Sequence, residues 1–174
     1  MKISEIKNLI REVPDFPKPG IMFKDITPIL SHPGALHSLN VHFDKAINGI
    51  PFDMVAGLES RGFIFGASYA HHTNKGLVLV RKPGKLPSAV YAKEYQLEYG
   101  SSKFEIHKDA IKPGQKVIIF DDLLATGGTA KTASELIEMC GGKVVGLCFL
   151  IELSFLKGRE NFAQYPVYSL IQFE

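Results

Sequence analysis

The chain lacks the residues and runs that mark several classes of protein. Its 174 residues include no tryptophan and only two cysteines, Cys140 and Cys148. The cysteines lack C-x-x-C spacing, and none of the six histidines lies in a motif such as H-E-x-x-H, so neither a disulfide framework nor a structural zinc site is indicated. The apolar run Val144–Ile151 is far shorter than the ~20 residues of a membrane span. With no signal-peptide hydrophobic region at the N-terminus, we expect a cytoplasmic protein that does not enter a membrane.

An excess of one charge is also missing. Lys and Arg number 20 against 18 Asp and Glu, which gives a formal net charge of +2. That charge is too small for a protein held on nucleic acid by its overall charge, so we expect no nucleic-acid partner. Glycine (16 residues) and proline (10 residues) stay well below the share typical of disordered chains. The length favours a single domain over residues 1–174.

What is present is an alternation of short apolar runs with helical segments. The runs are rich in β-branched residues and occur at Met54–Leu58, Leu77–Val80, Val117–Phe120, Val144–Ile151 and Val167–Ile171. Between them, Phe63–Ala70 has helical length, and apolar residues from Ala133 to Cys140 recur at helical spacing. This alternation is typical of a mostly parallel sheet flanked by helices. The sequence therefore predicts an α/β fold.

Two segments do not follow this alternation. Apolar residues recur every three or four positions from Ile3 to Val13 and predict a short helix, which Pro14 ends, and a second helical stripe covers Leu36–Ile47. Residues 82–107 are polar and rich in tyrosine, lysine and serine. We expect residues 82–107 to form a long mobile loop or a hairpin beside the functional site.

The most informative stretch is Val117–Thr129, VIIFDDLLATGGT. Its apolar residues predict a buried strand with Asp121 and Asp122 at the carboxyl end, the end where open α/β sheets bind ligands. The small residues that follow lead into a helix, so that backbone N–H groups and the positive end of the helix dipole can face an anion. We therefore predict a phosphate site formed by Ala125, Thr126, Gly127, Gly128 and Thr129.

The acidic pair needs a different partner, because carboxylates repel a phosphate. Asp121 and Asp122 would bind hydroxyls or a metal, and a ribose 5-phosphate satisfies both halves of the stretch. The alternative is that the acids are ordinary strand-end residues and the glycines a simple helix entry. A P-loop NTPase is excluded, because the nearest match to its motif, Gly57–Gly62, is followed by Phe63 rather than lysine. No G-x-G-x-x-G of a dinucleotide site occurs either.

An apolar strand, two acids and a T-G-G-T turn resemble the phosphoribosyl-pyrophosphate (PRPP) motif of the type I phosphoribosyltransferases. Asp15–Leu30 is similar to the base-binding segment of the adenine-specific members, and Ala56–Gly66 is similar to their pyrophosphate loop. Further matches occur at Arg81–Pro87, Leu97–Gly100 and Ser169–Glu174. The resemblance therefore runs from Asp15 to the last residue.

This resemblance implies an enzyme of purine salvage that transfers the 5-phosphoribosyl group from PRPP to adenine, giving AMP and pyrophosphate. It also implies a small N-terminal hood, residues 1–32, folded over the carboxyl edge of the sheet. The implied contacts are the 5′-phosphate on Ala125–Thr129, the ribose hydroxyls on Asp121 and Asp122, pyrophosphate on Ser60, Arg61, Lys82 and Lys85, and adenine on Met22, Phe23, Lys24 and Leu153. Solvated lysines at 82 and 85 and a core role for Leu153 remain open alternatives. Lys24 replaces the arginine of many relatives and loses its bidentate fork, which leaves its side-chain contact open.

The resemblance also implies the catalytic groups and the partners. Glu98 and Tyr99 match the family's mobile-loop pair, which places the glutamate near the imidazole nitrogens of the base, and Arg61 completes the expected catalytic set. Mg²⁺ is expected to bind through substrate and water near Asp121, without direct protein ligands. The family is usually homodimeric, and we expect the same here.

Two other functions are weighed against this one. A PRPP- or purine-responsive regulator would need a nucleic-acid-binding module, for which the short N-terminal helix is too small. A phosphoribosyltransferase for 6-oxopurines commonly carries an aspartate in the phosphate loop, at the position where this chain has Ala125. The sequence therefore favours adenine as the base.

Overall fold

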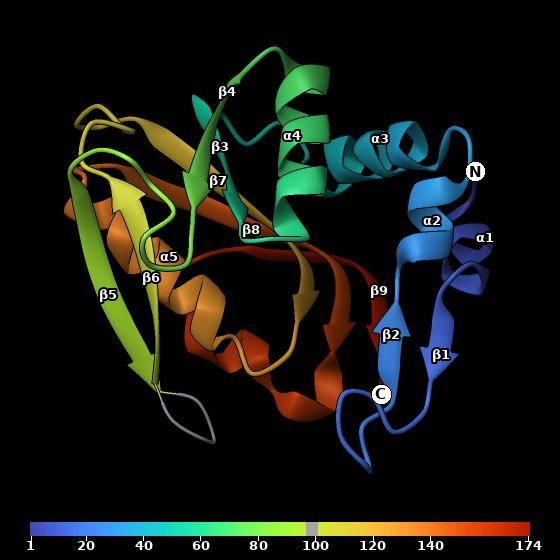
Figure 1. Ribbon diagram of the computed structural model, residues 1–174. Coiled ribbons are helices and arrows are strands. Elements are labelled where there is room, and N and C mark those ends of the chain that lie inside the picture. Colours follow the sequence, from blue (N-terminus) through green and yellow to red (C-terminus); the bar gives the residue numbers. More distant parts are fainter. Residues whose placement is uncertain (97–100) are drawn as a thin grey trace.

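The centre of the molecule is a five-stranded parallel sheet (Figure 1). The computed structural model describes residues 1–96 and 101–174, with the backbone alone at 95–96 and 101–102. The strands lie in the order β4 (Gly76–Val80), β3 (Met54–Leu58), β7 (Lys116–Leu124), β8 (Lys143–Leu153) and β9 (Val167–Phe173). All neighbours are parallel. Every predicted apolar run is a strand, and the predicted α/β fold is confirmed.

β7 runs further than its apolar residues predict. β7 continues through the acidic pair, and its Leu124 still pairs with Glu152 of β8. Asp121 and Asp122 lie near the carboxyl end of the strand, as predicted, but inside β7 rather than at its last residues, because backbone pairing to β8 continues beyond the apolar side chains. Successive side chains of a strand point to opposite faces, and here Asp122 is buried whereas Asp121 is partly exposed.

The order of the strands reverses at β3. The chain passes from β3 through α4 (Gly62–Thr73) to β4 on one side, and later returns to β7 on the other side. Open α/β sheets bind ligands at such a switch point, outside the carboxyl ends of the strands. The loops that follow β3 and β7 are therefore the expected walls of a site.

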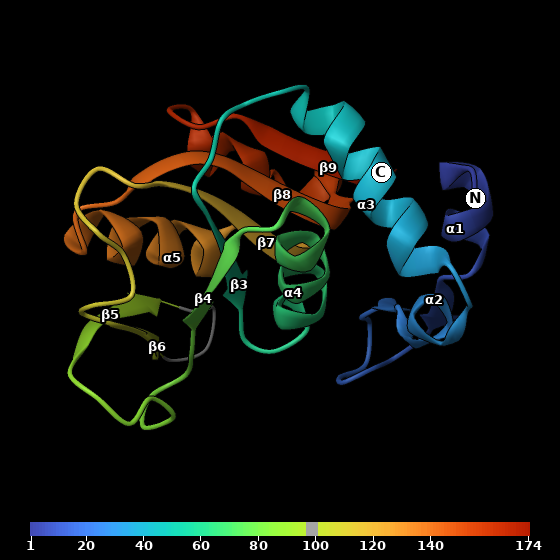
Figure 2. The same cartoon turned by 90° about the horizontal axis from the view of Figure 1, so that it is seen from above.

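Different elements cover the two faces of the sheet (Figure 2). On one face, α3 (Ala35–Ile47) and α4 pack Phe43 and Tyr69 against Phe120, with ring centroids 4.9 and 4.6 Å from that of Phe120. On the other face, α5 (Gly128–Met139) buries Leu136 in a second cluster that includes Ile119. The predicted helical stripes are thus confirmed as the inner faces of these helices.

Residues 82–107 contain a hairpin, one of the two forms expected. β5 (Val90–Gln96) and β6 (Ser101–His107) pair antiparallel, with Val90 opposite His107. β6 buries Phe104 and Ile106, and Lys93 of β5 forms an ion pair with Glu135 of α5 at 2.9 Å. The hairpin therefore covers the same face as α5. Glu98 and Tyr99 belong to residues 97–100 and lie outside the described residues.

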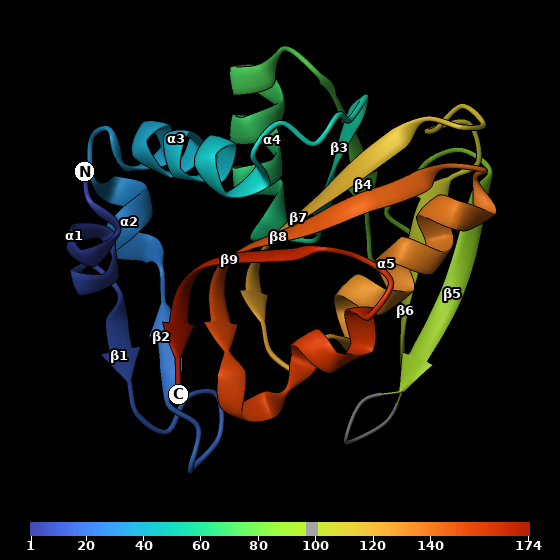
Figure 3. The ribbon, with the colours of Figure 1, turned by 180° about the vertical axis from the view of Figure 1, so that it is seen from behind.

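The N-terminal hood contains α1 (Ile3–Asn8), β1 (Arg11–Val13), β2 (Phe23–Asp25) and α2 (Thr27–Ser31). The predicted helix was too long, because Val13 pairs with Phe23 across an antiparallel ladder that the Arg11–Asp25 ion pair, 3.0 Å, reinforces. The hood lies beside the carboxyl end of β9 (Figures 1 and 3), where Lys24 Nζ lies 4.1 Å from the ring centroid of Phe173.

Two short 3-10 helices connect β8 to β9. They are η1 (Ser154–Leu156) and η2 (Gly158–Phe162), and the apolar pattern predicts neither of them. Within residues 1–96 and 101–174, none of the helices has both the length and the apolar character that crossing a membrane requires.

Candidate active site

A cavity of about 300 Å³ opens at the carboxyl ends of β3, β4 and β7. It is lined by residues from four separate stretches of the chain: Glu59, Ser60 and Arg61 after β3, Lys82 after β4, Phe104 of β6, and Asp121, Asp122, Leu123, Ala125 and Thr129 in and after β7. This is the sheet edge at which the sequence places the ligand. The fold therefore collects most of the predicted polar residues in one space.

The predicted phosphate loop forms a smaller cavity of about 70 Å³ at the start of α5, lined in part by Ala125–Thr129. Gly127 has a φ of +84°, which glycine adopts without strain. A Cβ on Gly127 would lie 2.8 Å from the carbonyl oxygen of Gly158. The loop is therefore too closely packed from behind to accept a side chain at this position, and its open side faces the cavity.

The two aspartates carry more negative charge than their surroundings compensate. Burial and the neighbouring charge of Asp122 raise the pKa of Asp121 well above its ordinary value. Burial also raises the pKa of Asp122, although the guanidinium of Arg61 works against this rise. The Nε of Arg61 lies 2.9 Å from Oδ2 of Asp122. Such a pair is poised to accept hydroxyl donors or a cation.

Arg61 links the acids to the hood. Its guanidinium carbon lies 5.2 Å from the ring centroid of Phe23, while its Nε contacts Asp122. The loop that carries Arg61 comes close to β7 because residue 62 is glycine: a Cβ there would lie 2.8 Å from Oδ1 of Asp121. The sequence predicts Arg61 as a pyrophosphate ligand, and the structure brings it to the cavity with an acidic partner.

Glu59 is a polar residue of this site that the sequence reasoning missed. Its carboxylate accepts a hydrogen bond from the backbone N–H of Lys82 at 2.9 Å and pairs with Arg81 Nε at 3.3 Å. Burial acts to raise the pKa of Glu59, but the hydrogen bond from Lys82 and the charge of Arg81 outweigh it, so the pKa is lowered. A lone acid before S-R-G, with a basic run after the next strand, is the signal that could have identified it.

The two predicted lysines differ in their position relative to the cavity. Lys82 lines the cavity. Lys85 is half exposed, lies 3.7 Å from Glu59, and is not among the described residues that line the cavity. The Glu59–Ser60 peptide bond that precedes Arg61 is cis.

The four residues predicted for adenine lie apart from the lining of the large cavity. Phe23 contacts Phe16 edge to face at 5.0 Å and reaches the cavity through Arg61, while Met22 is 48% exposed. Lys24 forms an ion pair with Glu12, and Leu153 packs on the core beside the end of β8. The ammonium group of Lys24 thus contacts Glu12 of the hood and the ring of Phe173, so it does not face a base as a free cation.

Among the described residues, no three His, Cys, Asp or Glu side chains come together as a metal cluster. Asp121 and Asp122 are the neighbouring carboxylates of the cavity. The histidines, which the sequence assigns to structure, make local contacts: His72 Nε2, for example, lies 2.7 Å from Asp44, and Tyr69 donates to the same carboxylate at 3.0 Å.

Comparison with known proteins agrees with this arrangement. The family model described as phosphoribosyl transferase domain matches residues 29–171. Fold and site together define a phosphoribosyltransferase of type I. An adenine phosphoribosyltransferase from Chloroflexus aurantiacus is 52% identical over 173 residues, which cover 99% of this chain and 100% of that protein.

Solved structures show which members of this family the chain resembles. The crystal structure of adenine phosphoribosyltransferase from Thermoanaerobacter pseudethanolicus superposes with a TM-score of 0.96 at 51% identity, over 99% of this chain and 100% of that one. The enzyme from Saccharomyces cerevisiae, complexed with an imino-altritol bisphosphate and adenine, gives 0.91 at 42% identity, over 97% of each chain. The chain belongs to the adenine phosphoribosyltransferase family, purine-salvage enzymes that convert adenine and PRPP into AMP and pyrophosphate. The predicted family, fold and enzymatic activity are confirmed.

Proposed function

We propose that phosphoribosyl transfer takes place in the cavity at the carboxyl ends of β3 and β7, with a definite division of roles. Ala125–Thr129 would hold the 5′-phosphate, Asp121 and Asp122 the ribose hydroxyls, and Ser60, Arg61 and Lys82 the pyrophosphate. The observation that carries this proposal is that residues of four distant stretches, among them the cations Arg61 and Lys82 and the acids Asp121 and Asp122, line one cavity. Lys85 would act from the rim of this cavity, beside Glu59.

The charges of the site suit the chemistry of the transfer. Breaking the bond between ribose C1 and the pyrophosphate oxygen develops positive charge on the sugar, which nearby carboxylates stabilise. Arg61 and Lys82 would receive the negative charge of the departing pyrophosphate. Because Arg61 lines the cavity and contacts Asp122 at 2.9 Å, its side chain would exchange this carboxylate for pyrophosphate oxygens.

Mg²⁺ fits the acidic pair, because this ion is usually held by one or two carboxylates together with water and substrate phosphates. Asp121 and Asp122 are the residues that would face it, through water or the ribose hydroxyls. When bound, the ion would shield the charge of the pyrophosphate.

Adenine would bind between the hood and the cavity. Phe23 is the proposed stacking surface, backbone groups around Met22 would read the edge of the base, and Leu153 would cover the opposite face. Support comes from the S. cerevisiae relative, whose structure contains adenine. Glu98 and Tyr99 remain the proposed proton partner and its loop neighbour. A homodimer in the cytoplasm is part of the same proposal.

A matched pair of glycine variants tests the phosphate loop. Gly127 and Gly49 have φ values of +84° and +78°, but a Cβ at Gly49 has no atom within 4 Å whereas one at Gly127 meets Gly158. Both alanine variants carry the same backbone penalty, so a difference between them reports the crowding of the loop. We expect Gly127→Ala to weaken PRPP binding, measured by calorimetry, by at least the ~tenfold that one lost charged hydrogen bond is worth. Equal PRPP affinity in the two variants would place the 5′-phosphate elsewhere.

A further inference from the structure

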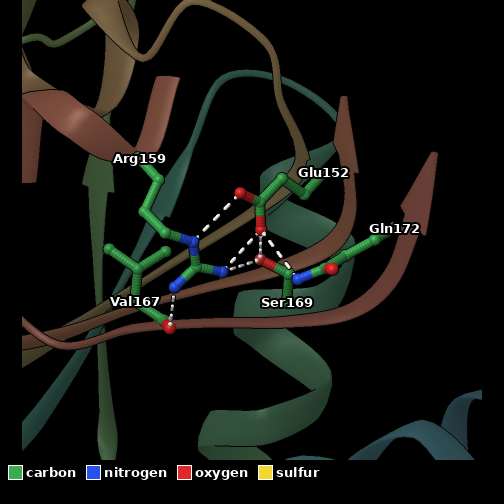
Figure 4. Close-up of polar contacts among 5 residues, drawn as sticks. All are labelled: Glu152, Arg159, Val167, Ser169 and Gln172. Atoms are coloured by element: carbon green, nitrogen blue, oxygen red, sulfur yellow. Dashed lines mark hydrogen bonds and ion pairs between the residues drawn. The ribbon is translucent and has the colours of Figure 1, made fainter. Parts of the chain in front are cut away.

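Glu152, at the end of β8, is a buried acid that the proposed mechanism does not use. It is 5% exposed and accepts hydrogen bonds from Arg159 through Nε at 3.0 Å and Nη2 at 2.5 Å (Figure 4). Ser169 donates to the same carboxylate, and Gln172 lies 3.4 Å from it. A buried carboxylate that receives a bidentate guanidinium is a specific, geometrically fixed contact.

Arg159 joins three elements at once. Besides Glu152 of β8, its guanidinium donates to the carbonyl oxygen of Val167 at 2.7 Å and to the hydroxyl of Ser169 at 3.0 Å, both on β9 (Figure 4). Arg159 itself lies in η2, a short 3-10 helix with little stability of its own. These contacts therefore anchor η2 to the edge of the parallel sheet.

Other residues of η2 pack against the phosphate loop. Asn161 Nδ2 donates to the carbonyl oxygen of Thr126 at 2.8 Å. Gly158 lies so close to the loop that a Cβ there would be 2.0 Å from the carbonyl oxygen of Ala125. The buried ring of Phe162 approaches Gly127, where an added Cβ would come within 3.0 Å of it.

We propose that Arg159 and Asn161 are positioning residues that hold the 5′-phosphate loop in its binding geometry. This rests on the proposed function, in which Ala125–Thr129 binds the phosphate. The hydrogen bond from Asn161 fixes the carbonyl group of Thr126, so that the N–H groups of the loop stay directed toward the cavity. Arg159 fixes the helix on which Asn161 stands. Groups that bind a ligand through backbone N–H need such support, because a displacement of ~0.5 Å spoils their geometry.

Asn161→Ala is the primary test, with Glu160→Ala, an exposed neighbour on the same 3-10 helix, as the matched control. The readouts are calorimetric affinities for ribose 5-phosphate, which needs the loop, and for pyrophosphate, which would bind at the opposite wall. Losing one neutral hydrogen bond corresponds to about a fivefold change in affinity. We expect ribose 5-phosphate to bind about fivefold more weakly, with pyrophosphate affinity and the control variant unchanged.

The outcomes separate this inference from the proposed function. Equal losses for both ligands would indicate a general structural role and would overturn the positioning role. An unchanged ribose 5-phosphate affinity in Asn161→Ala would overturn it too, provided that Gly127→Ala binds that ligand more weakly. If Gly127→Ala also binds normally, the phosphate loop itself is misassigned and the proposed function fails.

Arg159 is tested by a conservative and a non-conservative change. Arg159→Met removes all four donated hydrogen bonds, and Arg159→Lys keeps the charge beside Glu152 but not the fork. We expect the affinity for ribose 5-phosphate to decrease in the order parent, lysine variant, methionine variant, with the methionine variant at least tenfold below the parent. A methionine variant that is folded by near-ultraviolet circular dichroism and binds ribose 5-phosphate like the parent would refute the role of Arg159.

Discussion

Single carboxylates of this molecule differ in how well their charge is compensated. Glu59 and Glu152 each lie against an arginine and accept further hydrogen bonds, so that their pKa values are lowered although burial acts to raise them. Asp121 and Asp122 share Arg61 as a cationic neighbour, and burial keeps the pKa of both raised. Glu59 and Glu152 thus hold arginines of neighbouring loops, whereas Asp121 and Asp122 lie in the cavity, which Glu59 also lines, with their pKa values raised. Charge compensation thus distinguishes the supporting acids from the proposed binding acids.

This difference predicts the behaviour of Asp121→Asn. Because the folded-state pKa of Asp121 lies above its unfolded value, the folded protein retains a proton between the two values and loses stability as the pH rises through that interval. The amide removes this loss, so the variant without ligand should melt higher than the parent at neutral pH but not in acid. A gain of about 1 kcal/mol would raise Tm by ~2–4 °C. Activity should fall in the same variant.

Asp122→Asn is the control for this measurement. Asp122 also pairs with Arg61 at 2.9 Å, so its amide variant loses an ion pair along with the repulsion and should gain less. Thermal melts from acid to neutral pH compare the three proteins. A pH-independent difference between the parent and Asp121→Asn would show that Asp121 has an ordinary pKa in the folded state.

At the scale of elements, the hairpin is an insertion beside the site rather than part of the sheet. β5 and β6 follow β4 in the chain and pack with α5, the helix whose start carries the phosphate loop. β6 also contributes Phe104 to the cavity lining. The described part of the hairpin therefore lies against the wall that would bind the 5′-phosphate.

Glu98→Gln tests the proposed proton partner, which lies between β5 and β6 in the sequence. A positioned general acid–base contributes ~10²–10⁴-fold to rate, and we expect kcat with adenine to fall by about that factor. PRPP affinity should change little, because the other loops set it. Glu94→Gln, an exposed glutamate on β5, is the matched control. Turnover of adenine at the parent rate by Glu98→Gln would assign the proton to water.

Elements differ in how much of them the sequence could predict. β3 and β7 are evident because their apolar residues are buried on both faces, and the T-G-G-T turn predicts the start of α5. α2 and η2 escape prediction because they are short and depend on tertiary or capping contacts, such as the hydrogen bond from Thr27 to Asp25 and those of Arg159. β1 escapes for the same reason, since its partner β2 lies across a proline-rich turn.

The same limit applies to the residues of the site. Ser60, Arg61, Lys82 and the acids could be placed because each follows or ends a recognisable strand. Glu59 was missed, because its role depends on Arg81 and Lys85 of a neighbouring strand connection, and only the basic run after that strand points to it. Lys24 forms an ion pair with Glu12 and lies over the ring of Phe173, which is near the other end of the chain. No local sequence pattern reveals a contact between such distant residues.

At the scale of the whole molecule, one edge of the sheet carries partly exposed apolar residues. Among the described residues of the five-stranded sheet, β4 pairs with β3 alone, and its Leu77 and Leu79 are each 36% exposed, as is Ile64 of the neighbouring α4. Exposed edge strands with apolar residues favour association. This edge supports the proposed homodimer.

Sedimentation equilibrium tests the dimer. We expect twice the mass of the chain at micromolar concentration, and a shift toward the monomer in Leu79→Lys, because a charge at this position would be desolvated in the interface. Leu156→Lys, at a residue 40% exposed in η1, is the control. A parent protein that sediments as a monomer would contradict the homodimer, and an unchanged dimer in Leu79→Lys would place the interface on another surface.

The position of β3 between β4 and β7 also governs when the enzyme becomes competent during its synthesis. The proposed pyrophosphate wall follows β3 and β4, which are neighbours in the chain, whereas the proposed ribose and phosphate wall is contributed by β7 and α5, which emerge only after the hairpin. Parallel pairing between distant segments forms late, because a long loop must first be closed. A nascent chain therefore carries Arg61 and Lys82 before Asp121 and Asp122 are in place. It can bind a sugar phosphate only after β7 has paired with β3.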